Sequence, residues 1–167
     1  DWLTSGKNMA SVAKRYDILL REKYEMSKTV LITGASRGIG RATAVAFDRA
    51  GWQVVGSYCS SESRAASLQE QCPNMLLVRA DVAVEQDVER LFAAAQKRFG
   101  GVDVLVANAG IAQQSGLITD CTTQEWDRLV AVNLSGVFHC VKAALPAMVS
   151  AKQGRIITLS SIWGMVG

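Results

Sequence analysis

The chain has 167 residues, of which 49% are apolar and 20% charged, with only two prolines. This is the length of one ordinary domain, or of the front part of a larger one, and the composition argues against a disordered chain. The net charge of +3 is small and no basic run exceeds two residues, so the sequence gives no sign of nucleic-acid binding.

Further function classes are excluded by what the sequence does not contain. No stretch approaches the roughly 20 apolar residues of a membrane helix, and the start lacks the order of a secretory signal, so we expect a cytoplasmic protein without membrane contact. The four cysteines show no Cys-x-x-Cys spacing and there is one histidine, which predicts reduced thiols and no metal site.

Residues 1–25 differ from the rest of the chain. Apolar residues recur there at helical spacing with basic residues between them, which predicts one amphipathic helix. Met26 precedes the first strand as a natural start codon would. We therefore interpret the first 25 residues as an upstream fusion, a readthrough product or an expression remnant, with a genuine N-terminal docking helix as the alternative. Residues 26–167 form the expected domain.

From residue 28 onward, short β-branched runs alternate with longer helical patterns. The expected strands cover residues 29–33, 53–57, 75–79, 102–106 and 155–160. The expected helices cover residues 39–49, 63–71 and 84–99, and a long one runs from near 123 to about 150. Strands this apolar predict a parallel sheet covered on both faces, and right-handed crossovers make it doubly wound. The fold class is therefore α/β of the Rossmann type.

A glycine-rich turn stands between the first strand and the first helix. Glycines let the backbone approach a ligand where a Cβ would collide, and the helix points its free N–H groups and positive dipole end at the same place. A pyrophosphate fits there, and the strand–turn–helix context favours a dinucleotide site over a purely structural turn. The residues expected to hold the dinucleotide are Gly34, Ser36, Arg37, Gly38, Ile39 and Gly40.

The spacing Gly-x-x-x-Gly-x-Gly resembles the first turn of the short-chain dehydrogenase/reductase family. Further motifs match in order along residues 28–167, namely Asp81-Val82, Asn108-Ala109-Gly110, Asn133 on the long helix and Ser160-Ser161. The resemblance implies strands one to five of the family sheet. It also implies that Asp81 accepts a hydrogen bond from the adenine amino group, although a helix cap is the alternative role for Asp81.

The resemblance gives two further residue groups a place at the cofactor. Val82 would line the adenine ring, and residues 108–110 would pass beneath the cofactor ribose. The chain has Ala107 where the family usually has an asparagine. This departure puts the hydrogen bond of that side chain in doubt, but not the path of the backbone.

The end of the second strand bears on the choice of cofactor. NAD-binding sheets of this type commonly carry an acid there, and in this chain Tyr58 occupies the position, with no acid until Glu62. Arg37 can reach a 2′-phosphate as a charge-assisted donor, unless it is an ordinary solvated loop arginine. The two observations favour NADP(H) over NAD(H).

The resemblance implies hydride transfer between the nicotinamide and a carbonyl or alcohol carbon. Ser161 matches the family's substrate-orienting serine and Asn133 its water-anchoring asparagine. A simple strand-end serine and a buried polar residue tying two helices together are the alternatives. The family's Tyr-x-x-x-Lys pair is expected after Ser161, but the sequence ends at Gly167 without it, and we take the match Tyr24 to Lys28 as coincidence. We therefore expect a domain truncated before this motif and inactive as given.

Two functions remain open. The first is an NADP-dependent oxidoreductase that is a homo-oligomer, dimer or tetramer, when full length and acts on a small-molecule or acyl-thioester substrate. Within the family, residues 35–40 and 155–161 most resemble reductases of 3-oxoacyl-(acyl-carrier-protein) thioesters, although dehydrogenases of glucose, polyols and hydroxysteroids share much of the pattern. The alternative is a non-catalytic NADP(H)-binding module or degenerate relative.

Overall fold

The computed structural model of the chain describes residues 28–112 and 116–161. The amphipathic helix expected within residues 1–25 lies outside these ranges and stays a prediction, as does the domain boundary after residue 25.

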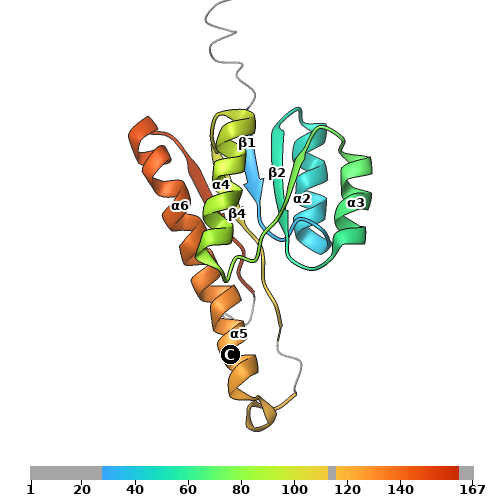
Figure 1. The fold of residues 1–167 in the computed structure, drawn as a ribbon, viewed down its shortest axis with the longest axis vertical. Coiled ribbons are helices and arrows are strands. Elements are labelled where there is room, and N and C mark those ends of the chain that lie inside the picture. Colours follow the sequence, from blue (N-terminus) through green and yellow to red (C-terminus); the bar gives the residue numbers. More distant parts are fainter. Residues whose placement is uncertain (1–27, 113–115, 162–167) are drawn as a thin grey trace, which may run out of the picture.

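The described residues form a five-stranded parallel sheet in the order β3-β2-β1-β4-β5 (Figure 1). Its strands are β1 (Thr29–Ile32), β2 (Gln53–Tyr58), β3 (Leu76–Arg79), β4 (Val104–Ala107) and β5 (Arg155–Thr158). β1 pairs with β2 on one side and β4 on the other, so the chain winds outward from β1 in both directions. This is the doubly wound α/β architecture predicted from the alternating pattern.

Helices connect the strands close to the predicted bounds. They are α2 (Gly38–Arg49), α3 (Glu62–Gln71), α4 (Glu85–Phe99), η1 (Ile118–Asp120), α5 (Thr123–Val130), η2 (Ala131–Ser135) and α6 (Gly136–Ala151). The long helix predicted from residue 123 to about 150 is continuous in direction, but one π-helical turn, η2, separates α5 from α6. A capping box begins this helix, in which Thr122 accepts from the Glu125 N–H and the Glu125 carboxylate accepts from the Thr122 N–H.

The core lies on both faces of the sheet because successive strand residues point to opposite sides. Val30 and Ile32 of β1 pack with Ala44 of α2 and Leu68 of α3. Leu31, between them, packs on the other side with residues of α4 and α6. Figure 1 shows the same division, with α2 and α3 on one side and α4 and α6 on the other. Apolar residues at consecutive strand positions are therefore explained by burial on two faces.

The α5–α6 helix meets the sheet through a stripe of mostly small residues. Val132, Gly136, Cys140, Ala144 and Met148 are buried. The opposite face is apolar but exposed, at Leu134, Phe138, Leu145 and Val149. Trp126 of α5 is exposed as well.

Residues Thr123–Ala151 are also long and apolar enough, by length and composition alone, to cross a membrane. This differs from the prediction of no membrane helix, which rested on the absence of an uninterrupted apolar run of about 20 residues. The stripe packed against the sheet fits a covering helix of an α/β domain, and a single helix of this kind is weak evidence for a membrane span.

Candidate functional site

A cavity lies at the carboxyl ends of the strands, between β1 and β4, where the winding direction reverses. Its volume is about 390 Å³. Ligands of doubly wound proteins bind at this kind of switch point. The cavity is lined by the glycine turn, the end of β2 and the loop after β4, together with the following residues: Ala80, Asp81, Val82, Arg128 and Val132.

The glycine turn is held against the loop after β4 by hydrogen bonds across the switch point. The buried Thr33 Oγ1 accepts from the backbone N–H groups of Asn108, at 3.0 Å, and Ala109, at 2.9 Å. In return, the Asn108 side-chain amide donates to the carbonyl oxygens of Thr33, at 2.8 Å, and Gly34, at 3.3 Å. The Asn108 side chain thus connects the loop after β4 to the glycine turn. It does so although Ala107, before it, replaces the asparagine that the family usually has.

Glycine occupies the three positions of the turn for different structural reasons. Gly34 has a φ of +67° and Gly38 one of +55°, a region that L side chains rarely adopt. A Cβ on Gly38 would meet no protein atom within 4 Å, so the start of α2 faces open space in the cavity. Gly40 does not line the cavity; a Cβ there would collide with the Gly34 carbonyl and the Asn108 amide. Gly40 therefore allows α2 to pack on the turn.

The end of β2 forms one wall of the cavity. Tyr58, Cys59 and the serines at 60 and 61 line it, and no acid comes from this strand. Arg79 of β3 fixes the loop by donating to the Cys59 carbonyl at 3.2 Å and pairing with Glu62 at 3.1 Å. Burial, and then the nearby Asp81 carboxylate, raises the pKa of the Cys59 thiol. The thiol is therefore neutral near pH 7 and a poor nucleophile.

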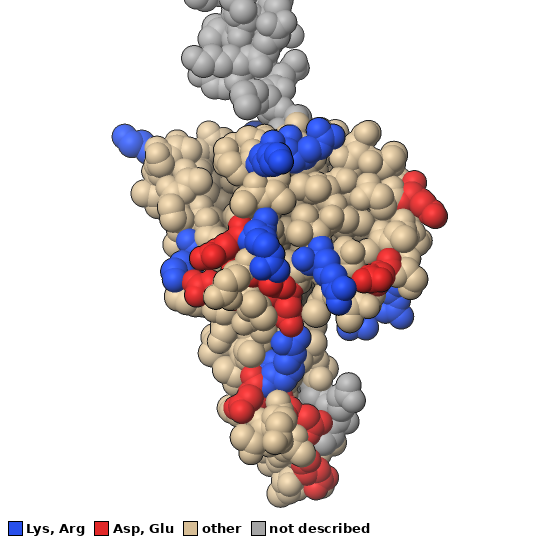
Figure 2. All heavy atoms as spheres, viewed as in Figure 1, with Lys and Arg blue, Asp and Glu red and all other residues tan. Residues whose placement is uncertain are grey.

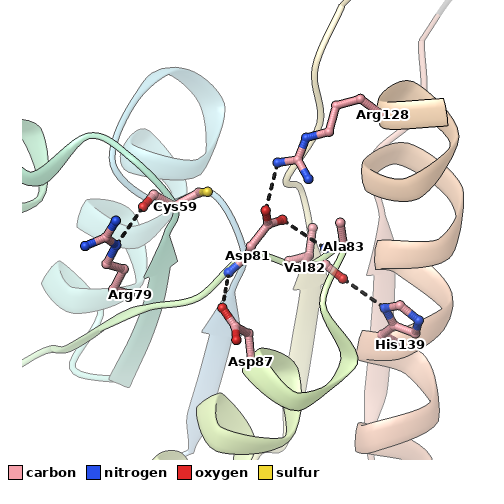
Figure 3. Close-up of polar contacts among 8 residues, drawn as sticks. All are labelled: Cys59, Arg79, Asp81, Val82, Ala83, Asp87, Arg128 and His139. Atoms are coloured by element: carbon pink, nitrogen blue, oxygen red, sulfur yellow. Dashed lines mark hydrogen bonds and ion pairs between the residues drawn. The ribbon is translucent and has the colours of Figure 1, made fainter. Parts of the chain in front are cut away.

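Asp81 follows β3 and faces Arg128 of α5 (Figure 3). One carboxylate oxygen accepts from the Ala83 N–H at 3.0 Å, and the other accepts from the Arg128 guanidinium at 2.8 Å. The Asp81 N–H donates to the Asp87 carboxylate at 3.0 Å, and this bond lowers the pKa of Asp87. The alternative role as a helix cap is wrong, because Val84 and not Asp81 stands at the N-cap position of α4. The Asp81 carboxylate bonds instead to the Ala83 N–H in the turn before the helix.

The two residues predicted to be catalytic lie outside the lining of this cavity. Asn133 sits in the π-helical turn and binds Ile111 of the cavity wall through both amide atoms, at 2.9 and 2.8 Å. It is exposed and ties a loop to a helix, which differs from the buried tie between helices considered as its alternative. Ser161 is exposed and follows β5. His139 of α6 donates from Nδ1 to the Val82 carbonyl at 2.9 Å.

Residues 28–167 match the short chain dehydrogenase family, which is most of the chain. The chain belongs to the short-chain dehydrogenases.

Two relatives within the short-chain dehydrogenases show which members of the family this chain resembles. The chain is 38% identical over 147 residues to the 3-oxoacyl-(acyl-carrier-protein) reductase FabG of Staphylococcus aureus, an alignment covering 86% of this chain and 59% of the relative. It is 39% identical over 145 residues to the 3-oxoacyl-(acyl-carrier-protein) reductase of Synechocystis, covering 84% and 58%. The chain thus spans about three fifths of the length of the relatives it matches.

Most cavity-lining residues of this short-chain dehydrogenase were predicted from its motifs. All the predicted cofactor residues line the cavity except Gly40. The lining residues that the motifs did not indicate are Ser57, Cys59, Ser60, Ser61, Ala80, Ile111, Arg128 and Val132. Ser60 and Ser61 lie three and four residues after the predicted strand end at residue 57 and could have been found from that position. Arg128 has no local signal, because its partner Asp81 is 47 residues away in sequence.

Proposed function

We propose that the cavity-lining residues form the NADP(H)-binding part of a short-chain dehydrogenase that reduces the ketone of a 3-oxoacyl thioester. The observation that carries the proposal is the cavity at the switch point. One cavity there combines the glycine turn, the start of α2, two arginines and a single carboxylate. The substrate class follows only from the names of the two reductases above.

The residues present fit a dinucleotide phosphate. Gly38 begins α2 beside the cavity, and the first N–H groups of a helix have no partner within the helix and attract anions. The open space above Gly38 leaves room for the phosphates. No acidic residue stands in the first turn of α2 to repel them.

The lining at the end of β2 supports NADP(H) over NAD(H). Arg37 and the hydroxyl groups of Ser60 and Ser61 line the cavity on the side where the adenosine ribose of such cofactors lies. A guanidinium and hydroxyl groups suit a 2′-phosphate, whereas an NAD-specific site would carry a carboxylate. Tyr58 at the last position of β2 supplies none.

The bound nicotinamide would supply the hydride, and the chain's own part is to hold the cofactor and orient the substrate. We propose Ser161 as the donor to the substrate oxygen. Asn133 would hold the loop around Ile111 and, in the whole protein, anchor the water of the proton path. The 167 residues contain no Tyr-x-x-x-Lys pair after Ser161, so we expect them to bind NADP(H) without turnover. We further propose that the whole protein is a cytoplasmic homo-oligomer.

Calorimetric titration of the chain with NADPH and NADH tests the binding function. We expect NADPH to bind more tightly, and Arg37→Ala to weaken NADPH binding roughly 10- to 100-fold while changing NADH little, because a charge-assisted hydrogen bond contributes about 1.5–3 kcal/mol. Arg49→Ala is the matched control, since Arg49 is an exposed arginine in the last turn of the same helix.

The outcomes separate the parts of the proposal. Absence of binding to either dinucleotide would contradict the assignment of the cavity. Tighter binding of NADH would contradict the cofactor preference alone. NADPH oxidation with an acetoacetyl thioester by these 167 residues would contradict the expected lack of turnover, above all if Tyr24→Phe abolished it.

A further inference from the structure

An ion pair crosses the wall of the cavity between two elements far apart in sequence. The Arg128 guanidinium of α5 donates to the Asp81 carboxylate after β3 at 2.8 Å. Both residues line the cavity, and Figure 3 shows the arginine reaching from the helix toward the loop. The Asp81 side chain is 23% exposed and the Arg128 side chain 45%, so a ligand in the cavity can reach both.

The packing of the α5–α6 helix against residues 81–82 fixes where Arg128 lies. A Cβ on Gly136 would come within 2.6 Å of the Val82 Cγ2, so only a glycine lets α6 approach the loop this closely. The His139 ring donates to the Val82 carbonyl at 2.9 Å. The 81–82 loop is therefore held by α6 at Val82 and by α5 at Asp81.

Asp81 is held in place by hydrogen bonds at both its carboxylate and its backbone N–H. Its two carboxylate oxygens accept from Ala83 and Arg128, and its N–H donates to Asp87. A carboxylate offers about four acceptor positions, so the two bonds leave capacity for a ligand N–H. Asp81 is the only acidic residue among the described residues that line the cavity.

The sheet order indicates which part of the ligand meets Asp81. In doubly wound dinucleotide sites the phosphates lie at the first turn and the adenosine ribose beside the end of the second strand. β3 lies next to β2 on the side away from β4. A base attached to that ribose is therefore directed toward the end of β3, where Asp81 stands.

We propose that Arg128 is a positioning residue for adenine recognition. It holds the Asp81 carboxylate in the orientation that accepts from the 6-amino group of the adenine, and its charge offsets that of Asp81 against the anionic phosphates. This inference rests on the proposed function, because it requires an adenine dinucleotide in the cavity. It assigns a role to a residue on α5, outside the glycine turn and the strand ends.

The test compares NADPH with its hypoxanthine analogue, in which an oxygen replaces the 6-amino group. Both are titrated calorimetrically into the 167-residue chain and its variants. We expect the unmodified chain to prefer NADPH by about 10-fold, since a site built around a donor rejects the analogue lacking it. Arg128→Met should reduce this preference to about twofold, and Arg128→Lys, which keeps the charge, should retain part of it.

Lys142→Met is the matched control, because Lys142 forms an ion pair of similar length with Glu85, at 2.7 Å, away from the cavity lining. Its preference should equal that of the unmodified chain. A double-mutant cycle keeps the inference falsifiable if Arg128→Met alters the fold: once Asp81→Asn is present, Arg128→Lys should not change the preference further.

The failures are distinguishable. If the unmodified chain binds neither dinucleotide, the proposed function is wrong and the inference falls with it. If the chain binds NADPH but Arg128→Met leaves the preference unchanged, or weakens both dinucleotides equally, the positioning role is wrong and the proposed function stands.

Discussion

Thr33 shows how one hydroxyl group can connect the two halves of the sheet. Its side chain is buried at the switch point and accepts from two backbone N–H groups of the loop after β4. A buried N–H without an acceptor costs more free energy than the bond itself contributes, because the group has lost its contact with water. The position of the loop after β4 against the glycine turn therefore depends on this oxygen.

Thr33→Val keeps the shape of the side chain and removes the acceptor. We expect the free energy of unfolding to fall by about 2 kcal/mol and NADPH binding to weaken, because two N–H groups lose their partner. Thr29→Val is the control: Thr29 is equally buried, but its hydroxyl makes one bond, to the Gln53 side chain at 3.0 Å. Equal losses for the two variants in urea denaturation would contradict this account.

Cys140 gives the stability a measurable dependence on pH. Burial raises the pKa of its thiol from 9.0 to about 12. Below pH 9 the thiol is protonated in both states, whereas above it the unfolded chain loses the proton and the folded chain keeps it. The contribution of the thiol is therefore complete below about pH 9 and is lost as the pH rises toward 12.

The expected slope is a loss of up to about 1.4 kcal/mol in the free energy of unfolding per pH unit above 9. Urea denaturation at several alkaline pH values measures it, with Cys140→Ala as the comparison that removes the titrating group. Parallel curves for the two proteins would show that the folded thiol ionises as readily as the unfolded one.

Among the elements, the π-helical turn between α5 and α6 has the clearest consequence. A π turn inserts an extra residue into a helix and often occurs at functional positions. Here it carries Asn133, whose amide binds both backbone groups of Ile111. The long helix thereby holds the loop that forms one side of the cavity.

Asn133→Ala removes both bonds to Ile111. We expect faster hydrogen–deuterium exchange in residues 108–112, while β1 and β4 keep their protection, because the change releases the loop and leaves the sheet intact. Asn74→Ala, an exposed asparagine before β3, serves as the control. Unchanged exchange in the loop would mean that other contacts hold it.

The assembled domain leaves apolar surface uncovered on the outer side of α5–α6. Leu134, Phe138, Leu145 and Val149 are spaced by four, seven and four residues, which places them on one side of a helix. Contiguous exposed apolar surface of this kind usually marks an interaction site. β5, at one edge of the described sheet, is also largely exposed.

We expect the chain to self-associate at micromolar concentration and Phe138→Glu to shift it toward the monomer. The reason is that a carboxylate in the middle of an apolar contact loses its water without gaining a partner. Light scattering coupled to size-exclusion chromatography measures the mass. Ala42→Glu, an exposed position on α2 in the opposite helical layer, should have no effect. A monomeric unmodified chain would refute the expectation.

Local sequence patterns predicted the helices and strands well, but they did not predict the π turn that interrupts the long helix. β1 and α3 begin or end within a residue of the prediction, because burial on both faces and turn residues set these bounds. The predicted fourth strand began at residue 102, whereas β4 begins at Val104. No period in the sequence predicts the π turn, which carries Asn133 at its contact with Ile111.

The sequence by itself determined the fold class, the glycine turn and most of the residues that line the cavity, because strand alternation and turn geometry depend on neighbours a few residues away. Only the tertiary structure decided that Arg128 faces Asp81, that Asn133 holds Ile111 and that Thr33 bonds across to Asn108. These contacts join residues 22 to 75 positions apart. They exist only once the strand register and the docking of the long helix are fixed.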